Sequence, residues 1–237
     1  MIVFVPGYDP STYANLKIAR LLNPSNCILL FENKATREEL VNILEISKFP
    51  LFVMSHGISN AFKAQPDPKP TNRKEVQTLN QENIAFSNMD VTLLKQRTVY
   101  AFACNTAQEL GEVAANFGSI WWGYSDTVPC PFDNPNPEVT TIFVDIFDFI
   151  KDNFTDPVSS EDIQIFLDKL KIKCENSAEQ IDLIDAQEEF DDILAIYATL
   201  IQIWDRLRVW LPGQEQPEQH PHSSSPSLSW KIATRRV

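Results

Sequence analysis

The sequence predicts an α/β fold, with a mostly parallel sheet covered by helices on both faces and followed by a helical C-terminal part. Short apolar segments alternate with amphipathic helical segments through the first half of the chain, as is typical of parallel strands joined by crossover helices. Only helical patterns follow from residue 131. We therefore expect an α/β core over residues 1–130, a helical extension over 131–210 packed on or beside it, and a disordered tail over 211–237.

The expected core contains five buried strands and the helices between them. The strands are predicted at 2–5, 27–32, 49–55, 98–103 and 119–123, and no sixth strand is evident after Gly123. Helices are predicted at 11–22, from the capping box Thr36–Glu39, at 89–95 and from the capping box Thr106–Glu109. Residues 58–87 are polar and poorly patterned, so we expect a long loop that could form a flap over a site.

Three helical patterns fill the C-terminal part. The first opens at Asn136–Pro137, which is a typical N-cap followed by proline, and the second opens at Ser160. The third opens at Ser177 and, if unbroken, continues to Val209. The residues after 212 are rich in Gln, Pro and Ser, which is typical of disorder.

Composition excludes several classes of function. The net charge of −12 argues against nucleic-acid binding, and no apolar run approaches the length of a membrane span. The four cysteines are dispersed and the start of the chain does not resemble a signal peptide, so we expect a cytoplasmic protein with reduced thiols. No zinc-like spacing is present, and we expect neither metal nor cofactor.

Cys104 stands at the end of the strongest apolar strand, directly before a predicted helix. This is the edge at which open α/β sheets place their ligands, and a helix N-terminus favours a thiolate. A buried structural cysteine is the alternative reading, because cysteine is among the most commonly buried residues.

His56 ends a second apolar strand and is the only histidine before position 220. A cysteine nucleophile needs a proton donor for its leaving group, and imidazole titrates near neutrality. Because both residues follow buried strands, we expect His56 and Cys104 to meet at the carboxyl edge of the parallel sheet.

These motifs resemble those of the caspase-like cysteine peptidases, the superfamily that holds the caspases, the metacaspases and the bacterial CHAT-type proteases. His56 precedes Cys104 by 48 residues, close to the spacing found in caspases. The Gln-Ala-Cys-x-Gly motif of true caspases is absent, so the chain is closer to the CHAT-type and metacaspase-like members. The segments that carry the resemblance are 55–57, 89–95, 103–107 and 118–126.

The resemblance implies a cysteine endopeptidase that acts on proteins or peptides. Cys104 would attack the scissile carbonyl and His56 would protonate the leaving amine. The backbone amides of Gly57 and Cys104 would form the oxyanion hole.

The resemblance also implies that specificity depends on the residue before the cut. Asp126 follows the last predicted strand at the same edge, and a carboxylate there would pair with a substrate Arg or Lys. Arg73 and Arg97 are less well placed to bind an acidic residue. We therefore expect cleavage after a basic residue, although Asp126 also fits an ordinary turn.

Two alternatives remain open at this stage. The chain could be another cysteine hydrolase, although it lacks a Gly-x-Ser-x-Gly elbow, a suitable histidine after Cys104 and a Cys-x5-Arg loop. It could also be a catalytically silent scaffold that binds a regulatory protein through its helical part.

Overall fold

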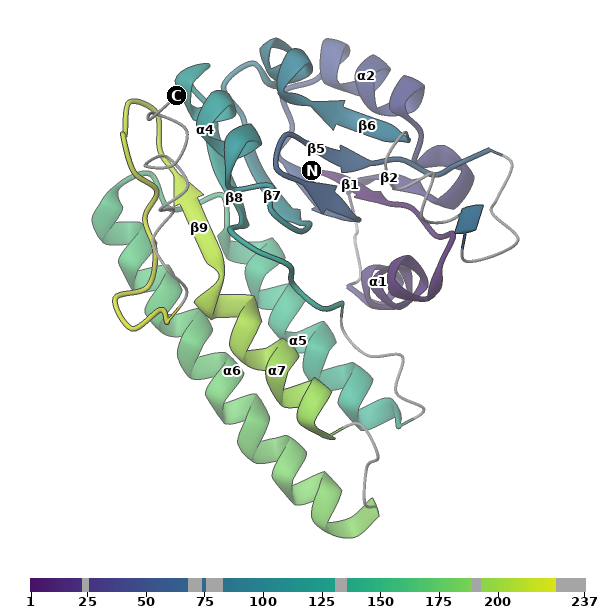
Figure 1. Cartoon of the computed structure of the whole chain (residues 1–237), viewed down its shortest axis with the longest axis vertical. Helices are drawn as coiled ribbons and strands as arrows, with labels where there is room; N and C mark the ends of the chain where they lie inside the picture. The colour runs from purple at the N-terminus through teal and green to yellow at the C-terminus, as the bar shows by residue number, and fades with distance from the viewer. Residues whose placement is uncertain (23–25, 68–73, 76–82, 131–135, 189–192, 225–237) are drawn as a thin grey trace.

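The computed structural model describes the chain except residues 23–25, 68–73, 76–82, 131–135, 189–192 and 225–237 (Figure 1). Its centre is a six-stranded sheet with the order β2-β1-β3-β7-β8-β9. The first five of these strands pair in parallel, and β9 runs antiparallel to β8. The predicted α/β class with a mostly parallel sheet is confirmed. The strands are β1 (Ile2–Val5), β2 (Ile28–Phe31), β3 (Leu51–Met54), β7 (Thr98–Phe102), β8 (Ile120–Tyr124) and β9 (Leu207–Trp210).

Helices cover both faces of the sheet, because the central strands carry apolar side chains on both faces. Phe52, Tyr100 and Phe102 pack with α1 (Pro10–Leu21), α5 (Pro137–Asn153), α6 (Ser160–Glu188) and α7 (Ile193–Asp205). Val53, Val99 and Ala101 pack with α2 (Arg37–Ile46), α4 (Glu109–Asn116) and the 3₁₀ helix η2 (Asn88–Leu94). A second 3₁₀ helix, η1 (Glu32–Lys34), follows β2.

A small antiparallel sheet replaces part of the loop predicted at 58–87. It has the order β4-β5-β6 and consists of β4 (Gly57–Ile58), β5 (Ala61–Lys63) and β6 (Ile84–Ser87). A two-residue turn joins β4 to β5, and Phe62 stacks on Phe86 in the core. The loop prediction is therefore wrong at these positions, where β5 and β6 each bury one phenylalanine. Most of the remaining residues of the predicted flap lie outside the described part of the chain.

The single helix predicted from Ser177 to Val209 is also wrong. Helix α6 runs through Ser177 without a break, since Cys174 and Ile181 continue its buried face on either side of that serine. Helix α7 then ends at Asp205, and β9 begins at Leu207.

Strand β9 is the sixth strand that the sequence did not reveal. Trp210 pairs with Trp121 and Val209 pairs with Trp122, so β9 is buried on both faces like its neighbour. The segment predicted as a helical extension therefore supplies a strand to the core sheet. Its helices pack on one face of that same sheet.

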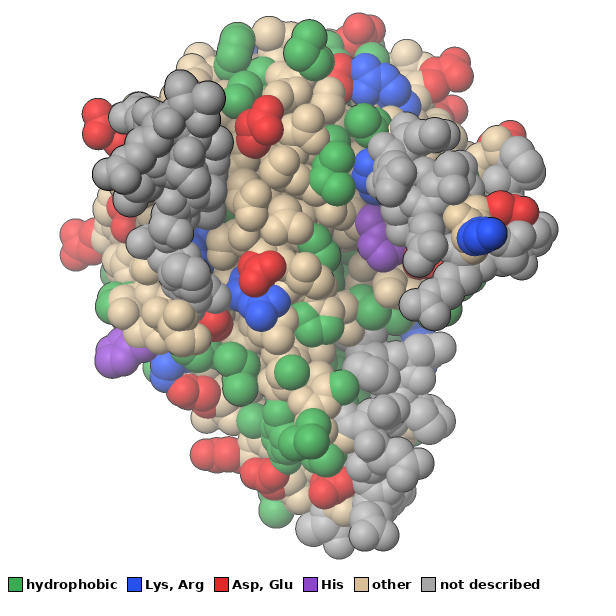
Figure 2. Space-filling view, viewed as in Figure 1, with side chains coloured by type: hydrophobic (Ala, Val, Ile, Leu, Met, Phe, Trp, Pro, Cys, Tyr) green, Lys and Arg blue, Asp and Glu red, His purple; other side chains and the backbone are tan. Residues whose placement is uncertain are grey.

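Hydrophobic side chains gather on the exposed surface of α6 and α7, in the lower part of the molecule as drawn (Figure 2). Leu183, Leu194 and Ile201 are 68%, 81% and 53% exposed. Partner binding through this helical part stays a prediction. Among the described residues, no helix is both long and apolar enough to span a bilayer.

The chain after β9 folds back onto the helices. Glu218 forms an antiparallel bridge with Val209, and His220 is buried. The predicted disordered tail is therefore wrong for residues 211–224, because paired backbone and a buried imidazole hold this segment in place. Residues 225–237 lie outside the described part of the chain.

Polar contacts hold the buried His220 ring on both of its nitrogens. Its Nε2 lies 3.0 Å from a carboxylate oxygen of Asp168, and its Nδ1 accepts a hydrogen bond from the backbone N–H of His222. An Nδ1 that accepts a bond carries no proton, so the ring fits as the neutral Nε2–H form. Burial lowers the pKa of His220, against the opposing charge of Asp168.

We expect the free energy of unfolding to fall as the pH drops below the usual histidine pKa of about 6.5. The unfolded chain then binds a proton that the folded His220 resists, so acidification favours unfolding. Urea unfolding at pH 7.5 and pH 5.5 measures this loss, which should shrink most in His220→Gln and less in His222→Gln, whose exposed ring contributes a smaller part of the lowered pKa of His220. An identical loss in wild type and His220→Gln would contradict the assignment.

Candidate catalytic site

His56 and Cys104 lie at the same edge of the sheet. Strands β3 and β7 are parallel neighbours in which Met54 pairs with Phe102, and each candidate residue follows its paired position by two. The N–H of Ser55 donates to Phe102 O at 3.1 Å and extends the pairing toward the candidate pair. The sheet thus delivers both residues to its carboxyl edge, as predicted.

Gly57 brings the His56 segment into contact with the backbone of Cys104. A Cβ atom at Gly57 would lie 2.4 Å from Cys104 O and 2.9 Å from Cys104 N, closer than atoms can approach. Only glycine allows this approach. The segment that carries His56 therefore packs directly against the peptide of the candidate nucleophile.

The hairpin also sets the direction of the Gly57 amide. The N–H of Lys63 donates to His56 O at 3.0 Å, so the next pair, Gly57 with Phe62, is a non-hydrogen-bonded pair of the antiparallel ladder. The Gly57 N–H consequently points away from β5. This direction is compatible with the predicted role of the amide as a donor to a substrate oxygen.

The Cys104 thiol is half-buried and contacts the backbone of Val128. Sγ accepts a hydrogen bond from Val128 N–H at 3.4 Å and donates to Val128 O at 3.6 Å. Burial raises the pKa of Cys104, and the hydrogen bond from Val128 opposes this without cancelling it. No hydrogen bond joins the thiol to His56 among the residues that the structure describes.

The capping box predicted at Thr106 does not form. The Thr106 hydroxyl donates to Ala103 O at 2.9 Å, and α4 begins only at Glu109, after a turn. The first two amides of α4 donate to Ser59 O, which belongs to the β4–β5 turn. The first amides of α4 are therefore bonded to Ser59 O and not to Cys104, and the expectation that this helix N-terminus stabilises a thiolate is wrong.

Asp9 is the site residue that sequence reasoning missed. Its Oδ2 lies 2.6 Å from His56 Nε2, and only 7% of the residue is exposed. It follows β1, the strand next to β3, and it caps α1 by accepting a hydrogen bond from Thr12 N–H. An aspartate before Pro10 has the sequence signature of a helix cap, so its second role was hidden. The available signal was its place after a buried strand, at the edge that holds His56.

The electrostatics of the pair favour a charged Asp9. Burial acts to raise the pKa of Asp9, but hydrogen bonds from His56 and Thr12 and the charge of His56 together lower it. The Tyr8 ring packs near the imidazole, with ring centroids 5.9 Å apart. With Nε2 held by a carboxylate, Nδ1 is the ring nitrogen left for proton transfer to a substrate.

Asp126 lies beside the thiol, after β8. Its charge raises the pKa of Cys104, and Asn105 N–H donates to Asp126 O at 3.2 Å. The carboxylate is 61% exposed and accepts from Thr127 N–H, while its other oxygen lies 3.9 Å from Arg206. The structure places Asp126 at the predicted edge, and its role in specificity stays a prediction.

Of the two arginines considered for an acidic specificity, Arg97 does not reach this edge. Arg97 is buried at the start of β7, where its guanidinium donates to Leu44 O and Ser47 O. Arg73 lies outside the described residues.

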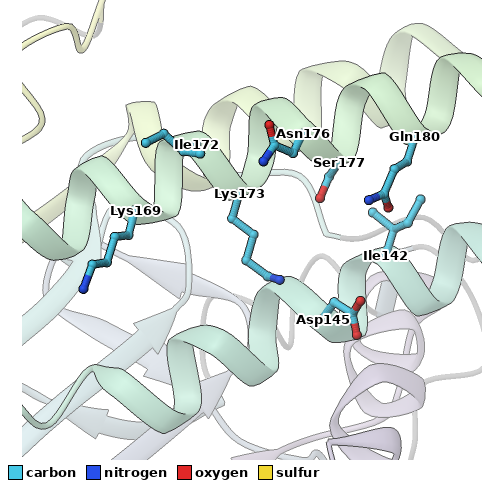
Figure 3. Close-up of a pocket in the computed structure, with 8 residues that line it drawn as sticks. All are labelled: Ile142, Asp145, Lys169, Ile172, Lys173, Asn176, Ser177 and Gln180. Atoms are coloured by element: carbon cyan, nitrogen blue, oxygen red, sulfur yellow. The ribbon is translucent and has the colours of Figure 1, made fainter.

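A separate cavity of about 300 Å³ lies between α5 and α6 (Figure 3). Charged and polar side chains of both helices surround it together with two isoleucines, and none of the sheet-edge residues lines it. Within the described residues, no group of three His, Cys, Asp or Glu side chains could hold a metal ion. The lining residues are Ile142, Asp145, Lys169, Ile172, Lys173, Asn176, Ser177 and Gln180.

No protein-family model, curated protein or solved structure matched this chain. The case for a function therefore depends on the chemistry of the chain's own residues.

Proposed function

We propose that this chain is a cysteine endopeptidase of the caspase-like type. Cys104 is the nucleophile, His56 transfers protons and Asp9 orients His56. The observation that carries the proposal is the 2.6 Å contact between Asp9 and His56, at the edge where Gly57 packs on the Cys104 peptide. A nucleophile, a base and a third group that orients the base form the usual arrangement of covalent catalysis.

The reaction begins with a neutral thiol, because burial raises the pKa of Cys104. His56 takes the thiol proton as Cys104 Sγ attacks the scissile carbonyl of the peptide. The amides of Gly57 and Cys104 then stabilise the oxygen that becomes negative. His56 returns the proton to the leaving amine, and water hydrolyses the acyl-cysteine to release the acid and regenerate the thiol.

Asp9 supports both proton transfers. Its carboxylate accepts a hydrogen bond from the Nε2–H group of His56, which leaves the Nδ1 atom for the thiol and the amine. It also stabilises the imidazolium that forms after His56 has taken the proton. A buried carboxylate gives this support at low dielectric, where charge interactions are strong.

The sheet is compatible with the proposal. The resemblance implies a sheet of six strands, and the central sheet of the described chain has six, the last of which comes from the C-terminal part. The candidate residues follow β1, β3 and β7, whose carboxyl ends meet at the edge where α/β proteins bind ligands.

We further propose that the enzyme cleaves after Arg or Lys. Asp126 offers a largely exposed carboxylate beside the nucleophile, and a carboxylate recognises a guanidinium through charge-assisted hydrogen bonds. Arg97, by contrast, is committed to backbone carbonyls at the opposite end of β7.

A panel of fluorogenic peptides that differ only in the residue before the cut tests the proposed function. We expect cleavage after Arg and Lys, and we expect Asp126→Asn to lower kcat/KM for these peptides about tenfold through loss of one ion pair. Asp152→Asn is the matched control, since Asp152 is also 61% exposed but lies on α5.

Two results would contradict the proposal in different ways. Cleavage after Asp, or unchanged preference in Asp126→Asn, would reject the specificity. No cleavage of any peptide, together with no labelling of Cys104 by an electrophilic peptide probe, would favour the silent scaffold.

A further inference from the structure

The segment Ser125–Val128, here called the strap, lies over the candidate nucleophile. Both hydrogen bonds of the Cys104 thiol go to Val128, whose N–H donates to Sγ and whose carbonyl accepts from it. Val128 is only 6% exposed and packs in the core. A thiol held in this way has no hydrogen bond to its base and is shielded from a substrate on the side of Val128.

Arg206, the residue before β9, contacts the strap. Its guanidinium donates to Thr127 O and lies 3.9 Å from the Asp126 carboxylate. The backbone completes the link, since Ser125 N–H donates to Arg206 O at 3.0 Å.

Two further bonds tie the strap to the turn that follows Cys104. Gln108 Nε2 donates to Ser125 O at 2.8 Å, and Asn105 N–H donates to Asp126 O at 3.2 Å. The strap thus connects the Cys104 turn with Arg206.

We propose that the strap is an autoinhibitory element and that Arg206 is the latch that keeps it closed. The inference rests on the proposed function, because it assigns a regulation to the same Cys104. Closure holds the thiol on Val128, and release frees Sγ to meet His56 and a substrate carbonyl. A basic substrate side chain that binds Asp126 competes with Arg206 for this carboxylate, so the substrate itself weakens the latch.

The rate of alkylation of Cys104 by iodoacetamide tests the latch without any need for peptidase activity. Peptide mapping by mass spectrometry follows each cysteine of the full chain separately. We expect Arg206→Met, which keeps the apolar stem and loses the guanidinium, to raise the rate at Cys104 about tenfold, as for the loss of a charge-assisted hydrogen bond. Arg206→Lys, which keeps the charge, should give a smaller rise.

The controls separate release of the strap from general loosening. Arg20→Met removes an arginine that pairs with Glu32 on the surface and should leave the rate at Cys104 unchanged. Cys174 is 1% exposed and should stay unreacted in every variant. A Cys104 rate in Arg206→Met equal to that of wild type overturns the proposal, and so does a rise matched at Cys174 in both Arg206 variants.

This experiment also distinguishes failure of the latch from failure of the proposed function. Faster alkylation of Arg206→Met without cleavage of any peptide would support the strap and reject the peptidase. Cleavage of peptides with an unchanged alkylation rate would support the peptidase and reject the strap.

Discussion

Replacement of Cys104 with alanine is expected to abolish peptide cleavage and leave the fold intact. The side chain is half-buried and its hydrogen bonds go only to Val128, so its loss removes the nucleophile at little structural cost. His56→Ala should be as severe, because nucleophile and base act as a unit and removal of either costs roughly 10⁴-fold or more in rate. The measurement is kcat/KM on the best peptide of the panel, with a thermal unfolding curve for each variant.

The other cysteines provide the controls for this prediction. Cys27, Cys130 and Cys174 form no disulfide in the described part of the chain, and their replacement by alanine should preserve cleavage. Cys130 is the most demanding control, because it is near enough to interact electrostatically with Cys104 and Asp9, while burial raises its own pKa and keeps its thiol neutral. Undiminished cleavage by purified Cys104→Ala would refute the assignment.

Asp9→Asn is expected to lower kcat/KM by roughly 10²-fold or more with little change in stability. Asparagine caps helices as well as aspartate does, so the hydrogen bond from Thr12 N–H to the cap survives. What disappears is the negative charge that stabilises the His56 imidazolium and the acceptor that selects its Nε2–H form. The substitution therefore separates the catalytic role of Asp9 from its structural one.

Asp9→Ala supplies the contrast, since it removes both roles and should also lower the free energy of unfolding by about 1 kcal/mol. Asp162→Asn, near the start of α6, controls for loss of an acidic group at a helix N-terminus away from the site. Full activity in Asp9→Asn would show that the contact with His56 serves only to hold α1.

The sequence by itself was sufficient for the features that depend on local pattern. Apolar segments that end at His56 and Cys104 predicted buried strands of a parallel sheet, since strands with no polar face need cover on both sides, and the structure makes these two strands neighbours. Two helix caps were also predicted from local spacing: Thr36 accepts a hydrogen bond from Glu39 N–H, and Asn136 accepts one from Glu138 N–H.

Patterns failed where a long-range partner decided the outcome. Leu207–Trp210 continues an apolar helical run in sequence. It nevertheless becomes β9, because its backbone pairs with β8, where Trp121 pairs with Trp210 and Trp122 with Val209. Thr106 has the sequence of a cap, yet its hydroxyl turns back to Ala103 and Ser59 O takes the amides of α4. In both places the backbone groups found their hydrogen-bond partners in a distant segment, β8 or Ser59, and not in the local helix that the sequence pattern predicts.

The candidate site divides in the same way. His56 and Cys104 were predicted as site residues from the sequence, because each directly follows a predicted strand, and the resemblance to caspase-like peptidases implied Gly57. The contacts of Asp9 with His56 and of Arg206 with Asp126 were identified only from the tertiary structure, since the place of Asp9 after a predicted strand indicates the sheet edge but not its partner. Strand order is a property of the whole sheet: it places β1 beside β3 and β9 beside β8, which brings Asp9 to His56 and Arg206 to the strap over Cys104.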